Sequence, residues 1–354
     1  MTHRFTGRKP TGFAVLAVSA AFVLSACGGG DDGSTSPVAS VVPTTPSTSA
    51  TASPSPSDSV TVTTASPFSG LPDGADKPVL VVKLDNTKAA QPHAGLTAAD
   101  LVYVEEVEWG LTRLAAVFAT QIPDVLGPVR SARVSDIDIV EPFGRVAFAY
   151  SGAQGKLLPS LAAANFFDAS ANASYVGWFD DANRNSPVDH MIRPAEVLDQ
   201  FPDAARASSI GLEFSAQPPR GGAPGTEASA TWPSSSISFS WDKAAGDYIV
   251  SMDGSVSRAA EGGSQRAATV VIQSVVQSDS GYGDKFGGVT PQIDVIGSGD
   301  AVVLRDGQSW PVTWERSGGP EGTTYLLADG SVMPFAIGQA WIVLLDATRS
   351  PAVS

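Results

Sequence analysis

The chain has 354 residues and a formal net charge of −14 at pH 7, from 22 Lys and Arg against 36 Asp and Glu. This excess of acids repels phosphate backbones and anionic lipid surfaces, so we predict no nucleic-acid partner. A single cysteine excludes an internal disulfide and a cysteine-based zinc cluster. The hydrophobic fraction of 43% supports real cores, and the length suggests about two domains.

The first residues have the pattern of a targeting segment. Three basic residues precede an apolar run at 13–24, which is too short to span a hydrocarbon core that needs ~20 residues. The run ends in Leu-Ser-Ala-Cys at 24–27, which resembles the bacterial lipobox, where the cysteine receives a diacylglycerol and becomes the first mature residue. We therefore predict a signal peptide at 1–26, lipidation at Cys27, and an exported lipoprotein anchored to the outer face of the cell membrane.

The predicted lipoprotein would be attached to the membrane by its acyl chains. Loss of 1–26 leaves 19 basic and 36 acidic residues, a net charge of −17, so no basic patch is expected to hold the protein body on a membrane. A diacylglyceryl anchor supplies the two chains that stable attachment usually requires. After Cys27, the segment to residue 67 is rich in Ser, Thr and Pro and has no Lys, Arg or aromatic residue. We predict that 27–67 is a disordered tether.

The first folded domain, predicted at 68–205, alternates strand and helix patterns. Residues 78–84 form a continuous β-rich apolar run, which is typical of a buried strand, and the turn-forming pair Asp85 and Asn86 ends it. A short helix is predicted after Ser135, whose hydroxyl is placed to cap it. The mixture predicts an α+β domain, a mixed sheet with helices.

Two β-rich runs, at 101–107 and 111–120, predict a hairpin within this domain. With a three-residue loop, Glu105 and Arg113 lie directly opposite each other, and their charges predict a cross-strand ion pair. With a two-residue loop, Glu106 takes the place of Glu105.

The second half of the chain has a different pattern. Residues 206–235 are rich in Pro, Gly, Ser and Ala and are predicted to be a linker. Beyond it, short β-rich segments are separated by Asp-Gly turns at 253–254, 306–307 and 329–330. We predict a small, mainly-β domain at 236–350.

The order of motifs in both halves closely resembles the YerB-like bacterial envelope lipoproteins. The motifs are Lys-Leu-Asp-Asn at 83–86, Gly-Leu-Thr-Arg at 110–113, Gly-Pro-Val-Arg-Ser-Ala-Arg at 127–133, and Thr-Trp-x-Arg at 313–316. The resemblance covers most of residues 78–345. It implies a lipid-anchored protein in two parts of unassigned activity, and it supplies no catalytic residues. At 186–190 the chain departs from the Pro-His-Asn run of the family, so the resemblance gives His190 no role.

The strongest site candidate is the pair Arg130 and Arg133, which fall on one face of a helix if the segment is helical. With Arg113 from the hairpin, they would form a pocket suited to a phosphate or carboxylate, because the guanidinium fork binds such groups through two hydrogen bonds. The alternative is an internal network in which the arginines pair with acids such as Asp85 and Glu105. The candidate ligand-binding residues are Asp85, Asn86, Glu105, Arg113, Arg130, Ser131 and Arg133.

Other residue types that often serve in catalysis, metal binding or sugar binding are weaker site candidates than the arginines. His93 and His190 lack the spacing of a zinc site and are interpreted as surface residues. We find no nucleotide-binding or nucleophile motif and predict neither a cofactor nor a metal. Four tryptophans of the second domain are interpreted as core residues rather than sugar-stacking residues. They are Trp241, Trp310, Trp314 and Trp341.

The sequence is compatible with two functions. The first is a non-catalytic envelope protein that binds a cell-wall glycan or an envelope protein through the face formed by Asp85 and the three arginines. The second is an envelope enzyme acting on a phosphorylated or carboxylated glycan, with Asp85 or Glu105 as the acid or base. An enzyme requires at least two arginines and a carboxylate around empty space. Pairing of both Arg130 and Arg133 with buried acids would argue against it.

Overall fold

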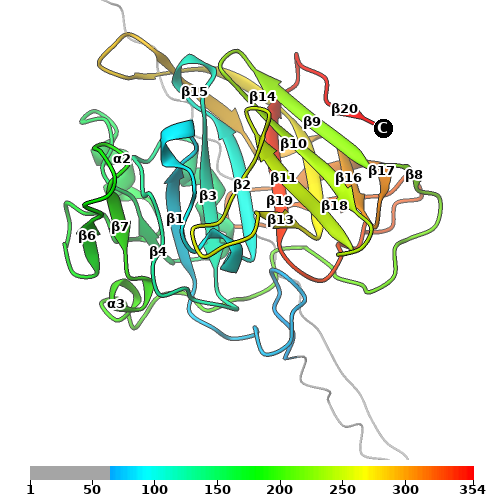
Figure 1. Cartoon of the computed structure of the whole chain (residues 1–354), viewed down its shortest axis with the longest axis horizontal. Helices are drawn as coiled ribbons and strands as arrows, with labels where there is room; N and C mark the ends of the chain where they lie inside the picture. Colours follow the sequence, from blue (N-terminus) through cyan, green and yellow to red (C-terminus); the bar gives the residue numbers. More distant parts are fainter. Residues whose placement is uncertain (1–63) are drawn as a thin grey trace, which may run out of the picture. The chain divides into compact units, whose positions relative to one another are not determined.

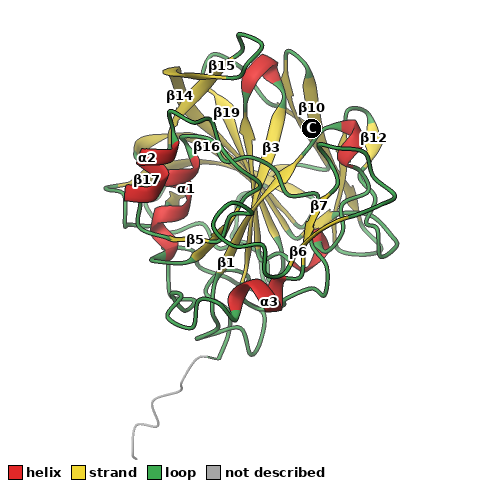
Figure 2. Cartoon of the chain, turned by 90° about the vertical axis from the view of Figure 1, so that its left-hand side faces the viewer, coloured by secondary structure: helices red, strands yellow, loops and turns green. Residues whose placement is uncertain are grey.

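The computed structural model describes residues 64–354, which are built mainly from strands. The strands form three sheets of twelve, six and two strands, and the helices are few and short (Figures 1 and 2). The predicted signal peptide, Cys27 and the predicted tether up to residue 63 lie outside the described residues. Within 64–354, no helix has the length and apolar character needed to cross a membrane.

The twelve-stranded sheet takes strands from both halves of the sequence. Its first-half strands are β1 (Leu80–Asp85), β2 (Leu101–Glu106), β3 (Thr112–Phe118), β4 (Ala147–Ala149) and β5 (Phe167–Asp168). Its second-half strands are β8 (Ala223–Pro224), β14 (Thr269–Gly283), β15 (Val289–Asp294), β16 (Gly297–Arg305), β17 (Gln308–Arg316), β18 (Thr324–Leu326) and β19 (Ala340–Asp346). The main order is β18-β17-β16-β14-β19-β2-β3-β1-β4-β5, with β15 beside β14 and β8 beside β17. Strand β19 pairs with β2 in parallel, so one continuous sheet runs through both halves.

The other strands form two smaller sheets, and the helices are short. The six-stranded sheet contains β9 (Glu227–Trp232), β10 (Ser235–Asp242), β11 (Asp247–Met252), β12 (Ser255–Val256), β13 (Arg266–Ala267) and β20 (Ala352–Val353), and the two-stranded sheet contains β6 (Trp178–Asp180) and β7 (His190–Ile192). The α-helices are α1 (Asp136–Val140), α2 (Leu158–Ala163) and α3 (Pro194–Leu198). Four 3-10 helices are η1 (Lys88–Ala90), η2 (Leu96–Ala98), η3 (Glu108–Gly110) and η4 (Glu141–Phe143).

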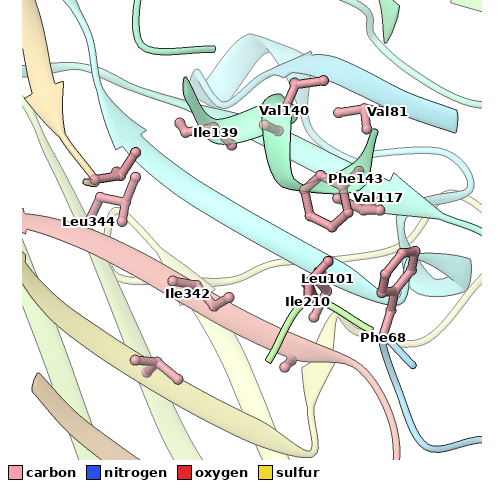
Figure 3. Packing of buried hydrophobic residues seen from close by; sticks show 14 of the residues in the cluster. Phe68, Val81, Leu101, Val117, Ile139, Val140, Phe143, Ile210, Ile342 and Leu344 are labelled. Atoms are coloured by element: carbon pink, nitrogen blue, oxygen red, sulfur yellow. The ribbon is translucent and has the colours of Figure 1, made fainter. Parts of the chain in front are cut away.

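Both faces of the large sheet are covered, which explains why β1 carries apolar residues on both of its faces. Successive side chains of a strand point to opposite faces. Val81 packs on one face with Ile139 and Phe143 from α1 and η4 (Figure 3). Leu80 packs on the other face in a cluster that includes Phe239 of the six-stranded sheet. All six β1 residues are therefore buried, and the predicted buried strand is confirmed.

The predicted fold class is confirmed: the first half supplies a mixed sheet with short helices, and the second half is mainly strand. Parallel pairs such as β1 with β4 occur beside antiparallel pairs such as β1 with β3. Within 206–235, the structure contains strands β8 and β9.

The prediction that Ser135 caps the following helix is wrong. Helix α1 begins at Asp136 as expected, but the Ser135 side chain makes no capping hydrogen bond. Its hydroxyl accepts a hydrogen bond from the Ile293 backbone N–H at 3.0 Å and donates one to the Pro291 carbonyl at 3.4 Å. The side chain thus ties α1 to β15, a contact with a segment more than 150 residues away that local spacing does not indicate.

Candidate anion-binding site

Three charged residues form a row across the ends of β1, β3 and β2. Arg113 of β3 lies opposite Asp85 of β1 on one side and opposite Glu105 of β2 on the other. Residues in register share one face of a sheet, so all three side chains lie on the face that α1 covers. Of the two hairpin registers considered, the structure has the one with a three-residue loop at η3, in which Glu105 lies opposite Arg113.

The predicted ion pair between Glu105 and Arg113 is wrong, because Glu105 has another partner. The Lys83 ammonium contacts Glu105 and also donates to Asp136 Oδ1 at 2.7 Å. The side chains of Lys83 and Glu105 are fully buried. Lys83 lies opposite Ala115, whose small side chain leaves room for the lysine to reach across β3. Burial lowers the pKa of Lys83 to about 8, against the opposing effect of the Asp136 charge.

Arg113 is left without a carboxylate partner among the described residues. It is 8% exposed, and its Nη1 donates to the Ser131 carbonyl at 2.9 Å. Burial, and then the charges of Arg133 and Arg130, lower the pKa of Arg113 to about 9. The guanidinium is still protonated at neutral pH, so a positive charge is held at the site with only a carbonyl to receive it.

Arg130 pairs with Asp85, but it does not lie on a helix as its spacing with Arg133 suggested. Arg130 Nε donates to Asp85 Oδ2 at 2.7 Å. Its backbone N–H bonds to the Lys83 carbonyl, and the Ala132 N–H bonds to the Gly152 carbonyl. Because residues 127–133 place these hydrogen bonds on neighbouring segments, the segment runs as extended chain beside β1, and the prediction of a helical face is wrong.

The Asp85 carboxylate is fixed in its ionised form. Burial alone would raise its pKa, but hydrogen bonds from the Thr87 hydroxyl at 2.5 Å and backbone N–H at 2.7 Å, together with Arg130, hold the pKa below its ordinary 3.8. The neighbouring Asn86 points elsewhere: its Nδ2 donates to Thr112 Oγ1 at 2.8 Å.

Arg133 pairs with Glu108 at the tip of the hairpin. Its Nη2 lies 2.6 Å from Glu108 Oε2, and its Nη1 donates to the Ala132 carbonyl at 3.0 Å. Glu108 also accepts a hydrogen bond from the Thr290 hydroxyl of β15. Burial would raise the pKa of Glu108, but the bonds from Arg133 and Thr290 outweigh it and hold the pKa below 4.5.

These arginines line a cavity of about 590 Å³ between the hairpin tip, the 127–133 segment and the β14–β15 connection. The cavity wall contains four cationic side chains, Arg113, Arg130, Arg133 and Lys285, and three acidic ones, Asp85, Glu108 and Asp284. Ser131 also lines it, whereas Glu105 does not. Its volume lies within the ~300–1,000 Å³ typical of small-molecule sites.

Aromatic side chains from distant parts of the chain complete the wall. They are Trp109, Tyr282 and Phe286. Trp109 is 55% exposed and Phe286 is 74% exposed, although both are large and apolar. The indole N–H of Trp109 donates to Asp284 Oδ2 at 2.9 Å, which links the hairpin tip to the β14–β15 connection. No motif in the sequence had pointed to these aromatics, to Lys83 or to Glu108 as site residues.

The structure contradicts the surface interpretation of His93 and confirms three of the four tryptophans as buried core residues. His93 is fully buried, with Nε2 at 2.7 Å from the Asp85 carbonyl, so its interpretation as a surface residue is wrong. The His190 side chain is partly exposed, and its Nδ1 lies 2.7 Å from Asp180 Oδ1. Trp310, Trp314 and Trp341 are buried core residues as predicted, and Trp241 is half-buried.

Comparison with known proteins identifies the class to which this fold belongs. Residues 68–207 match the model of the N-terminal domain, and residues 228–342 the model of the C-terminal domain, of the protein family of unknown function DUF3048. These matches span most of the chain, and the chain belongs to this family.

One relative matches this chain in both sequence and fold. The chain is 25% identical over 299 residues to "Putative lipoprotein YerB" of Bacillus subtilis (strain 168). The match covers 78% of this chain and 84% of that protein. The crystal structure of the YerB protein from Bacillus subtilis superposes with a TM-score of 0.68 at 21% identity, over 82% of this chain and 99% of that one. The resemblance to YerB-like proteins is thereby confirmed, and the two chains share a fold.

Proposed function

We propose that this chain is a lipoprotein of the cell envelope, anchored through Cys27 to the outer face of the membrane, and that its arginine-lined cavity binds an anionic glycan of the cell wall. The lipobox pattern at 24–27 and the name of the Bacillus subtilis relative support the anchor. The cavity supports the ligand class, as argued below.

The observation that carries the proposal is the state of Arg113. Arg130 and Arg133 each contact a carboxylate, but Arg113 lines the cavity, is almost fully buried and donates only to a carbonyl. A buried charge without a counter-ion is unfavourable, and a bound carboxylate or phosphate would supply one. The site therefore has one more cation than its own acids neutralise, in a chain that is strongly acidic as a whole.

The aromatic wall favours a sugar over a small inorganic ion. Trp109 and Phe286 expose large apolar rings at the cavity, and the Lys285 ammonium lies 5.1 Å from the centre of the Phe286 ring. Aromatic faces pack well against flat apolar surfaces, and a sugar ring presents such a face beside its polar groups. An anionic sugar thus matches the cations and the rings together.

The same contacts disfavour an enzyme. Asp85 and Glu108, which lie in the cavity, are bonded to Arg130 and Arg133, and their lowered pKa values make them poor proton donors at neutral pH and weak bases. Glu105, the other carboxylate considered as an acid or base, is buried with Lys83. A site that binds without changing its ligand fits these constraints better.

The test compares matched anionic and neutral sugars by isothermal titration calorimetry, using the full chain purified in detergent. The pairs are galacturonate with galactose and glucose 6-phosphate with glucose, so each pair differs at one position on the sugar. We expect at least one anionic sugar to bind more than tenfold more tightly than its neutral partner. Equal affinities within both pairs, or no binding of either anion, would overturn the proposal.

A further inference from the structure

A second cavity adjoins the first. It has a volume of about 550 Å³ and shares Asp85, Thr87 and Arg130 with the arginine-lined cavity, so the Asp85–Arg130 ion pair forms a common wall. Each cavity alone has the size of a small-molecule site. A single sugar bound at Arg113 would leave the second cavity empty.

Arg130 is placed to contact a ligand that passes from one cavity to the other. Its Nε is bound to Asp85, and its side chain is 25% exposed. Within the described part of the chain, neither of its terminal amino groups has a hydrogen-bond partner. Asp85 therefore orients the guanidinium while leaving donors for an oxygen-rich ligand.

The second cavity differs in chemistry from the first. Its wall includes the amide side chains of Gln91, Asn183 and Asn185. Arg184 also lines this cavity, but its hydrogen-bonding groups are occupied by other parts of the chain. Its guanidinium donates to the carbonyls of Ala90 and Pro92, and its Nε lies 3.4 Å from Asp181 Oδ2. The Asn183 amide already donates to Asp181 Oδ1 at 3.1 Å, but amides both donate and accept hydrogen bonds, so this wall suits the hydroxyl groups of a sugar unit.

We propose that the ligand is a glycan chain of at least several units: one anionic unit binds at Arg113 in the first cavity, and the following units cross Arg130 and lie against the amides of the second cavity. This inference rests on the proposed function, because it assigns the first cavity to an anionic sugar. Beyond the proposed function, it specifies the length of the ligand and the amide-lined surface that binds the later sugar units.

The test measures affinity as a function of chain length. Galacturonic acid monomer, trimer and hexamer are titrated into the full chain in detergent, and into the double variant Asn183→Ala/Asn185→Ala. Both asparagines are exposed, so the double variant is expected to fold, which thermal unfolding checks. For the unmodified chain we expect affinity to rise at least tenfold from monomer to hexamer. In the double variant, monomer affinity should stay the same and most of that gain should disappear.

The outcomes separate this inference from the proposed function. If the unmodified chain binds monomer and hexamer equally, or if the double variant keeps the full gain with length, the extended site is excluded while the anion site stands. If no length binds the unmodified chain, the inference fails, and the proposed function then stands or falls with the comparison of glucose 6-phosphate and glucose. A loss of monomer affinity in the double variant would also count against the inference, because it would mean that the asparagines act on the first cavity.

Discussion

Glu105 and Arg113 face each other across β2 and β3, yet Glu105 contacts Lys83, and Arg113 donates to the Ser131 carbonyl. Lys83 thus pairs with Glu105, the acid that lies opposite Arg113 in the hairpin register. One consequence is a buried network of Lys83, Glu105 and Asp136 beneath the site. The other is a cationic Arg113 at the cavity.

The buried network predicts a large loss of stability in Lys83→Ala. Removing the lysine leaves Glu105 and Asp136 buried without a cation, and breaking a buried ion pair on one side costs about 3–5 kcal/mol. Urea unfolding followed by fluorescence measures the change. The matched control is Lys88→Ala at an exposed position, expected within about 0.5 kcal/mol of the unmodified chain. A loss below about 1 kcal/mol in Lys83→Ala would contradict the network.

Ligand binding is expected to weaken at alkaline pH. Burial and the neighbouring Arg133 and Arg130 charges lower the pKa of Arg113 to about 9. Raising the pH through 9 removes this positive charge, and an anionic ligand loses its counter-ion. Affinity for galacturonate should be constant from pH 6 to about 8 and should fall above 9, whereas a site based on ordinary arginines would keep its affinity throughout this range. A flat profile up to pH 11 would show that Arg113 does not govern binding.

Glu108 predicts a contribution to stability that is lost in acid. Its folded-state pKa lies below 4.5, so the unfolded chain binds the proton first as the pH falls. The contribution is fully present above about 4.5 and decreases as the pH falls through the folded-state value. In Glu108→Gln, the free energy of unfolding should therefore depend less steeply on pH in the acid range below about 5. Thermal unfolding across this range measures the two slopes, and equal slopes would contradict the contact with Arg133.

Trp109 has a backbone conformation that tryptophan rarely adopts, with φ of 67° and ψ of 15°. Such strain costs about 1 kcal/mol or more in a residue other than glycine, while asparagine tolerates it better. We expect Trp109→Asn to keep or raise the free energy of unfolding and to weaken binding of the galacturonate trimer about tenfold. Destabilisation by more than about 1 kcal/mol with unchanged affinity would show that the indole serves packing rather than binding.

The sequence could predict the parts of the fold that depend on local pattern. Apolar residues on both faces of 80–85 indicated a strand covered on two sides, and the three-residue loop at 108–110 set the Glu105–Arg113 register correctly. Register follows from the period of two along each strand, which is a local property.

The site could be predicted only in part, because its contacts are not local. Arg113, Arg130, Arg133 and Ser131 do line one cavity with Asp85, as the motif order suggested. The partner of Glu105 comes from β1, however, and the aromatic wall includes residues 282 and 286, about 150 residues after the arginines. Lys83, the charged residue inside the apolar run 79–84, was an available signal, since a buried lysine requires acids nearby.

The most direct test of the anion site is the affinity of the galacturonate trimer for Arg113→Gln, measured by calorimetry at pH 7 beside the unmodified chain. Arg220→Gln is the matched control, because Arg220 is exposed and lines neither cavity. We predict at least a tenfold loss of affinity in Arg113→Gln, none in Arg220→Gln, and an unfolding temperature for Arg113→Gln that is unchanged or higher, since a buried charge has been removed. Unchanged affinity in a folded Arg113→Gln protein would contradict the account.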